Sequence, residues 1–373
     1  MLVVALMFSC DNSTELASPV TVDTLASGRV VVSNPDLAAV GEGKTIELVE
    51  ELRIGAALGT EPDAPELFGR VLSLAVDEDE RTYVADYQAN EVRVFDREGN
   101  FVRTIGRQGE GPGEFLRLAG IVWDRTSGVL WAVDTRGLRF SAFDARGRFL
   151  ATHPHGRDTD SFSIPWVGYS DLHGFLYDRE PRNFEVLLKR KTSTDGVLAI
   201  VDSLAVPQAE QDTYTVSSSY GTETRTVPMQ PVRMYAVGPD GAVWSATSSE
   251  FRLHKVDFNG DTLRTVELRR PAREFSRRER DSIAAANHIP ARRLPQTRPI
   301  IGHPRVGTDG WLWVPVEGDS TWEVFDDFGY HMGRATSPVS LRSLPVIVVG
   351  AGTITGVTQD ELGVQYVVRL RLR

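Results

Sequence analysis

The feature that most constrains this chain of 373 residues is a short pattern that recurs six times. Each copy starts with a glycine, once with an acid, and continues with alternating apolar residues and an aromatic ring in its centre. The copies are ERTYVAD (80–86), GVLWAVD (128–134), GFLYDRE (174–180), GAVWSAT (241–247), GWLWVPV (310–316) and GTITGVT (352–358), the last with Thr355 in place of the ring. Rings at equivalent places predict packing between repeated units rather than stacking on a ligand.

Each copy is one strand of a four-stranded unit. An apolar run precedes it, and in most units a strand, an Asp-x-x-Gly turn and another strand follow. These hairpins are VFDREGNFVRTIG (94–106), AFDARGRFLATHPHG (142–156), KVDFNGDTLRTVEL (255–268) and VFDDFGYHMGRA (324–335). Asp bonds to the turn backbone and Gly supplies positive φ, which favours hairpins. Six such units predict an all-β fold, a six-bladed β-propeller with four-stranded antiparallel blades.

The two ends of the chain are complementary. The sixth unit has only three strands and stops at residue 373, while KTIELVEELRIG (44–55) precedes the first unit as an extra strand. Pairing them closes the last blade with one N-terminal and three C-terminal strands, which removes an open edge. We therefore expect one domain over residues 44–373, in a chain that is monomeric.

Two long insertions, 207–230 and 269–300, join the fourth strand of one blade to the first strand of the next. Loops of this length are usually functional or disordered, and we expect both to fold over one face as a lid. The second should hold a short helix over residues 277–287, capped by Ser276 and ended by Pro290. It is rich in arginine, which suits either an anion-attracting rim or a solvated face balanced by Glu274, Glu279 and Asp281.

The connector IGRQGEGPGEF (105–115) has four glycines but leads into another strand, FLRLAGIVWD. A phosphate-binding loop should instead lead into a helix N-terminus, so a sharp joint between blades is the better interpretation. With the VADYQANEVRVFDREGNFVRTIG run before it, this stretch resembles an NHL repeat. The whole chain resembles the six-bladed β-propeller lipoproteins of bacteria, specifically over residues 44–156 and in architecture elsewhere. Most of that family has no assigned activity.

The chain opens MLVVALMFSC and then turns polar. Residues 1–10 look like a truncated lipoprotein signal in which Cys10 becomes lipidated, although no basic residue precedes the apolar run. The alternative is an ordinary thiol at an uncleaved N-terminus. With a lipid on Cys10, residues 11–43 would be a flexible tether, and the protein would lie in the cell envelope, periplasmic or surface-exposed.

The formal net charge of −10 argues against nucleic acid as a partner, since phosphate binding needs a basic footprint. We expect ligand contact at the mouth of the central channel, where basic residues stand near the starts of inner strands. These are Arg70, Arg117, Arg233, His303 and Arg305. The alternative is that each arginine pairs with an acid of the neighbouring blade.

Other polar patterns suit metal binding less well. Asp86 and Asp134 end second strands in equivalent places, which is more typical of turn capping than of a calcium site. His153 and His155 form a possible metal pair near Asp158 and Asp160, but no third histidine is close in sequence. The chain also lacks HExxH, GxSxG and Walker-type motifs, so we predict no catalytic residue, metal or cofactor.

Three functions remain open from the residues. The first is a lipid-anchored binding scaffold that takes a peptide, glycan or protein on its loop face. The second is a metal-dependent propeller hydrolase or lyase, such as a lactonase, with its site in the channel. The third is a cytosolic interaction module of the NHL kind, which a genuine signal at Cys10 would exclude.

Overall fold

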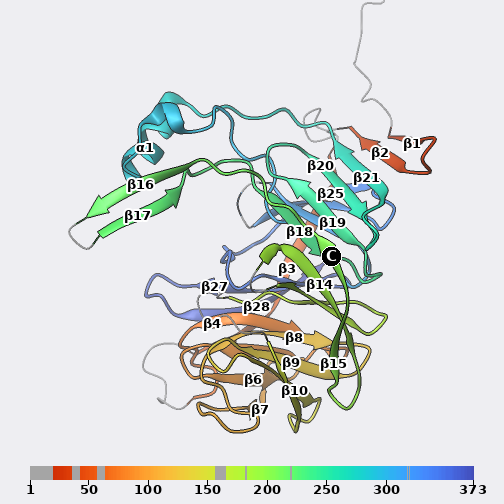
Figure 1. Ribbon diagram of the computed structural model, residues 1–373, viewed down its shortest axis with the longest axis vertical. Coiled ribbons are helices and arrows are strands. Elements are labelled where there is room, and N and C mark those ends of the chain that lie inside the picture. Colours follow the sequence, from red (N-terminus) through yellow and green to blue (C-terminus); the bar gives the residue numbers. More distant parts are fainter. Residues whose placement is uncertain are drawn as a thin grey trace, which may run out of the picture.

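The computed structural model describes residues 20–35, 43–56, 64–155, 165–180, 183–218, 221–316, 318 and 320–373. The chain is a six-bladed β-propeller, as the repeats predict. Figure 1 shows its sheets and a projection that carries β16, β17 and α1. No helix among these residues has the length and apolar character needed to cross a membrane.

Each blade has four antiparallel strands, which run in order from the inner strand at the axis to the outer strand. The first three blades are β4 (Val71–Val76), β5 (Thr82–Asp86), β6 (Glu91–Phe95) and β7 (Phe101–Ile105); β8 (Leu118–Asp124), β9 (Val129–Asp134), β10 (Arg139–Asp144) and β11 (Phe149–Pro154); and β12 (Tyr169–Ser170), β13 (Phe175–Glu180), β14 (Asn183–Thr192) and β15 (Leu198–Ala205). The others are β18 (Arg233–Val237), β19 (Val243–Thr247), β20 (Arg252–Val256) and β21 (Thr262–Leu268); β22 (Arg305–Val306), β23 (Leu312–Pro315), β24 (Thr321–Phe325) and β25 (His331–Thr336); and β26 (Val348–Gly350), β27 (Thr353–Gln359), β28 (Gln365–Leu372) and β3 (Thr45–Ile54).

The sixth blade closes the ring as predicted. β3, from the N-terminal side, is its outer strand and pairs antiparallel with β28, with Val367 opposite Ile54. The first residues of β3 also pair in parallel with the end of β25, which joins the fifth and sixth blades into one sheet. One strand therefore satisfies two sheet edges that would otherwise be open.

The repeated rings fill the space between blades. Tyr83, Trp131, Tyr177, Trp244 and Trp313 are all buried, which confirms the prediction that they belong to the core. Tyr83 stacks on Trp123 of the next blade, with ring centroids 5.3 Å apart and planes 18° apart. Rings of this size supply the apolar area that holds neighbouring sheets together.

The glycine-rich connector is a joint, as expected. It runs from β7 directly into β8, with no helix between them. Gly106 has a φ of +74°, and a Cβ atom there would lie 2.2 Å from the ring of Phe115. Only glycine therefore permits this turn, because any side chain would strain the backbone and displace the buried Phe115 ring.

The expectation of a tether over residues 11–43 is wrong where the structure describes it. β1 (Thr21–Thr24) and β2 (Val30–Asn34) form a hairpin, and β2 adds in parallel to β21, the outer strand of the fourth blade. The run Val30–Val32 favours a strand because its residues are β-branched. Asn34 is buried and fixes the hairpin, since it bonds to the Gly329 carbonyl at 3.0 Å and to the His331 amide at 2.9 Å.

The two insertions pack together into one projection, which we call the arm (residues 207–230 and 269–300). The first forms the hairpin β16 (Thr213–Ser218) and β17 (Gly221–Thr226), and the second holds α1 (Arg277–Ala286) and a 3₁₀ turn, η1 (Ala291–Arg293). Ser276 caps α1, as predicted, and it also forms a capping box with Glu279. A small core of Tyr214, Val227, Ala284, Ile289 and Leu294 joins the two insertions.

Candidate ligand-binding site

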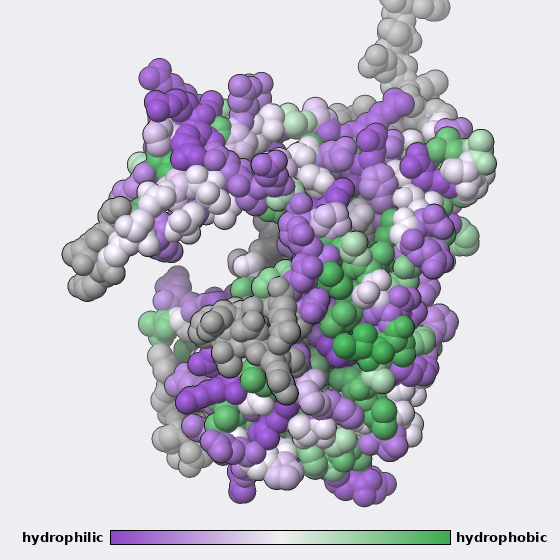
Figure 2. All heavy atoms as spheres, viewed as in Figure 1, coloured by the Kyte–Doolittle hydropathy of each residue, from purple (hydrophilic) through white to green (hydrophobic). Residues whose placement is uncertain are grey.

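A cavity of about 530 Å³, which we call the mouth cavity, opens where the arm is rooted in the propeller. Val206, at the end of β15, and His303, after the second insertion, both line it, so each insertion starts or ends at its wall. This is the side of the propeller to which fourth-to-first-strand loops belong. Figure 2 shows a hollow between the arm and the rest of the molecule on one face.

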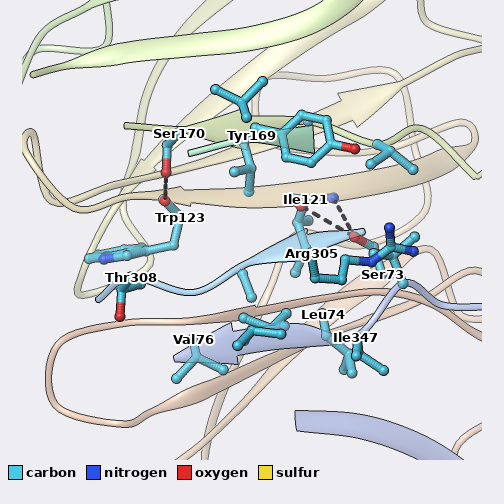
Figure 3. Close-up of a pocket in the computed structure, with 18 of the residues that line it drawn as sticks. Ser73, Leu74, Val76, Ile121, Trp123, Tyr169, Ser170, Arg305, Thr308 and Ile347 are labelled. Atoms are coloured by element: carbon cyan, nitrogen blue, oxygen red, sulfur yellow. Dashed lines mark hydrogen bonds between the residues drawn. The ribbon is translucent and has the colours of Figure 1, made fainter. Parts of the chain in front are cut away.

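A second cavity, of about 170 Å³, follows the propeller axis, and we call it the channel cavity. Inner strands of all six blades contribute to it, and most of its side chains are apolar. Tyr169, Val237 and Arg305 line both cavities, so the mouth cavity adjoins the channel cavity. Figure 3 shows the Arg305 side chain extended into the channel cavity.

The mouth cavity carries two guanidinium groups. Arg305 comes from β22, where it donates to the Pro304 carbonyl at 2.9 Å. Arg179 comes from the end of β13, and its guanidinium lies over the Tyr235 ring at 5.5 Å. None of the described residues that line either cavity is acidic. The described part of the wall is therefore positively charged, in a protein whose formal net charge is −10.

The pKa of His303 reflects the positive charge of this wall. Its side chain is exposed to the cavity yet surrounded by protein. Desolvation, together with the charges of Arg305 and Arg179, lowers the pKa of His303 to about 4. The imidazole is thus neutral near pH 7, and it becomes easier to protonate when an anion enters the cavity.

A buried ion pair supports another part of the mouth wall. Asp178 is fully buried and pairs with Arg190, whose Nε lies 2.7 Å from Oδ1. Nε2 of His155, a residue of the mouth wall, is 3.9 Å from Oδ2 of Asp178. Burial raises the pKa of Asp178, although Arg190 acts against the rise. Burial and the charge of Arg190 lower the pKa of His155 to about 4.

The structure places the predicted mouth residues in two groups. His303 and Arg305 line the mouth cavity, as their sequence position suggests. Arg70, Arg117 and Arg233 do not belong to the wall of either cavity. Arg70 is exposed and its guanidinium lies over the Tyr87 ring at 5.4 Å, while Arg233 is exposed at the start of β18.

Sequence reasoning missed Arg179 and Asp178, although a signal was present. In the six copies of the repeat, the place of Arg179 is otherwise held by Ala85, Val133, Ala246, Pro315 or Val357. A charged pair, Asp178–Arg179, therefore interrupts the third copy where the other copies are uncharged. Such a break in a repeat marks a blade with a different surface.

The acids at the ends of second strands act as caps. Asp86 accepts from the Gly69 amide at 2.8 Å and the Arg70 amide at 3.0 Å, and Asp134 accepts from the Arg117 amide at 2.9 Å. Each carboxylate thus fixes the chain just before an inner strand. Among the described ranges, no three His, Cys, Asp or Glu side chains converge to hold a metal ion. His155 faces Asp178, and Cys10, Asp158 and Asp160 lie outside the described residues.

The arginines of the arm are partly neutralised. Arg293 pairs with Asp212 of the other insertion at 2.7 Å, and Arg298 pairs with Glu279. Arg270 pairs at 2.8 Å with Glu323, a buried carboxylate that also accepts from His331 and Arg334. Burial alone would raise the pKa of Glu323, but the bonds from His331 and Arg334 lower it on balance. These arginines hold the arm to itself and to the fifth blade.

Comparison with known proteins identifies the fold family. A family model described as "6-bladed beta-propeller" (DUF5128) matches residues 64–269, more than half of the chain. The comparison with curated proteins finds no match. Among solved structures, virginiamycin B lyase from Staphylococcus aureus is 10% identical, with 88% of this chain and 100% of that chain covered and a TM-score of 0.47. A member of the DUF4221 family from Bacteroides vulgatus is 11% identical over 88% and 98%, with a TM-score of 0.48.

Proposed function

The chain belongs to the DUF5128 family of six-bladed β-propellers, and from this premise we propose that it is a binding propeller whose ligand enters the mouth cavity. One observation carries the proposal: a cavity of about 530 Å³ at the root of the arm adjoins the channel cavity and shares wall residues with it. Its volume lies within the range of small-molecule sites, which are mostly apolar with a few convergent polar groups. The mouth fits this description, with Arg179, His303 and Arg305 among aromatic and aliphatic side chains.

Binding without chemistry suits the wall better than catalysis does. A metal-dependent hydrolase would need several convergent oxygen or imidazole ligands in the channel. The described channel wall carries arginines and aliphatic side chains instead. The arm projects from the rim of the mouth cavity, and in this proposal it limits the access of ligands to the cavity, as a lid does.

We also place this propeller outside the cytoplasm, held by a lipid on Cys10. The support is the apolar run that ends in Ser-Cys at the start of the sequence. Labelling with radioactive palmitate should mark the wild-type protein and not Cys10→Ala. Equal absence of label from both proteins would remove the anchor and leave a cytosolic interaction module as the alternative.

Native mass spectrometry of protein purified from its own cells tests the binding function. Ser343 lines the mouth and is exposed, so Ser343→Trp should fill the entrance without disturbing the core. Thr194, exposed in the turn between β14 and β15, gives the matched control Thr194→Trp. We expect a co-purified small-molecule mass on the wild type and on Thr194→Trp, and its loss from Ser343→Trp. Equal retention by both variants, or no added mass on the wild type, would contradict a ligand in the mouth.

A further inference from the structure

We propose that the ligand is a monocarboxylate with an apolar body, its carboxylate held between Arg179 and Arg305 and its apolar part inside the channel. This inference rests on the proposed function, because it names the class of ligand for the same site. Three properties of the wall lead to this proposal: the sign of its charge, the hydrogen bonds that its serine hydroxyl groups already make within the protein, and the position of Arg305 between the two cavities.

The charge of the wall selects an anion. Arg179 and Arg305 both act on His303, so both charges lie near the same imidazole at the mouth. A cation would be repelled there, and a neutral ligand would gain little from the two guanidinium charges. A planar carboxylate matches the fork geometry of guanidinium, which makes it a favourable anion for such a pair.

The channel beyond the mouth selects an apolar body. Leu74, Ile121 and Ile347 stand in its wall (Figure 3). Two of its hydroxyl groups are already bonded to the protein: Ser73 donates to the Ile121 carbonyl at 3.2 Å, and Ser170 donates to the Trp123 carbonyl at 2.7 Å. These bonds tie neighbouring inner strands together. The wall therefore offers few polar partners along its length, and burying a polar chain such as a glycan would cost unpaired hydrogen bonds.

Arg305 gives the ligand its direction. It lines both cavities, whereas Arg179 and His303 line only the mouth cavity. An anionic head at the mouth is then contacted by all three side chains, and the next atoms of the ligand point down the axis. Aliphatic carboxylates and the C-terminus of an apolar peptide share this chemistry, and the test separates these two sources.

Isothermal titration calorimetry with defined probes tests the proposal. The probes are octanoate, octylamine, acetate and N-acetyl-Leu-Leu. We expect octanoate or N-acetyl-Leu-Leu to bind at least tenfold more tightly than acetate, which lacks the apolar body, and octylamine not to bind. The tighter of the two carboxylates identifies the source. Equal binding of octylamine and octanoate, or no difference between octanoate and acetate, would overturn the proposal.

Variants locate the carboxylate. Arg179→Gln should weaken octanoate binding about tenfold, as expected for a charge-assisted hydrogen bond. The matched control is Arg146→Gln, an exposed arginine in the turn between β10 and β11. At pH 6, octanoate binding to the wild type should take up protons, because a carboxylate beside His303 raises the pKa of that imidazole. His303→Gln should abolish the uptake. Unchanged affinity in Arg179→Gln, or proton uptake that persists in His303→Gln, would contradict the assigned position.

The two proposals fail separately. If a natural ligand occupies the mouth in the Ser343→Trp comparison but octanoate and octylamine bind equally, the cavity binds a ligand of another class. If Ser343→Trp and Thr194→Trp behave alike, the mouth is not the site, and the carboxylate assignment is lost with it.

Discussion

Glu51 and Arg369 are 318 positions apart in the chain, yet Arg369 Nε lies 2.9 Å from Glu51 Oε2. Arg371 donates to the other carboxylate oxygen at 2.8 Å and also reaches Glu80, at the turn between β4 and β5 of the first blade. Arg369 is almost fully buried. The closing strand β3 is thus joined by ion pairs to the C-terminal strand β28, and both are joined to the first blade.

The variant Glu51→Gln should therefore weaken the closure. It removes the nearest carboxylate from the buried Arg369 guanidinium, which keeps only Glu80 at 3.9 Å, and loss of a charged hydrogen-bond partner costs about 1–3 kcal/mol. Glu47→Gln, an exposed position of the same strand, is the control with the same change of charge. Urea unfolding followed by tryptophan fluorescence would measure both. Equal unfolding free energies for the two variants would show that the ion pairs do not fasten the ring.

The arm should loosen without unfolding the propeller. Leu294 is buried in the core that joins the two insertions, so Leu294→Ala removes packing from the arm alone. Such a truncation costs about 2–5 kcal/mol locally. We expect faster trypsin cleavage within 207–230 and 269–300, with the main thermal transition unchanged. Leu362→Ala, at an exposed leucine of the sixth blade, is the control and should be cleaved like the wild type. Unchanged cleavage of Leu294→Ala would mean that the two insertions do not depend on each other.

His155 should make the protein sensitive to acid. Its pKa is about 4 in the fold and about 6.5 in an unfolded chain, so the unfolded state binds more protons between these values. The free energy of unfolding then falls as the pH drops from about 6.5 to about 4, by up to about 3 kcal/mol from this group. Asp178 and Arg190 face the imidazole, and the raised pKa of Asp178 acts in the opposite direction at low pH.

Chemical unfolding at pH 7, 5.5 and 4.5 compares the wild type with His155→Gln. Both proteins keep Asp178 and Arg190, so the difference between their pH profiles reports the imidazole. The variant should lose less stability over this range. Parallel profiles would show that His155 does not titrate with a lowered pKa.

Repeats and turn chemistry were sufficient to predict the blades and the capped helix, because both depend on local spacing. The 3+1 closure followed from the number of strands, since the sixth unit lacks one strand and the N-terminal side has one to spare. The N-terminal hairpin was missed because the run Val30–Val32 is stabilised as a strand only by pairing with β21, more than 200 residues away.

Only half of the mouth wall was predicted. His303 and Arg305 follow from their place near the start of an inner strand, whereas Arg179 belongs to a second strand, where alternation alone predicts a core residue.

Backbone hydrogen bonds explain why Arg70 and Arg117 lie outside the cavity walls. The amides of Arg70 and Arg117 are held by the caps Asp86 and Asp134, before the inner strand begins. Their backbone position is thus set by the second strand of the same blade rather than by the channel. A sequence pattern gives the strand in which a residue lies, but the direction of a side chain at a strand end depends on such caps.

Gly120 should matter for the mouth more than for stability. It lies in β8, and a Cβ atom there would come within 2.3 Å of the Trp166 carbonyl oxygen. Trp166 lines both cavities and its amide donates to the Ala119 carbonyl at 2.9 Å, so Gly120→Ala must push this part of the wall away. Gly128, in the next turn, has open space but a φ of +66°, so Gly128→Ala costs about 1–2 kcal/mol through backbone strain alone. We expect octanoate binding to fall at least tenfold in Gly120→Ala and to persist in Gly128→Ala, although the second variant melts at a lower temperature. Binding that follows the melting temperature in both variants would instead tie affinity to global stability, and the Trp166 segment would lose its place in the site.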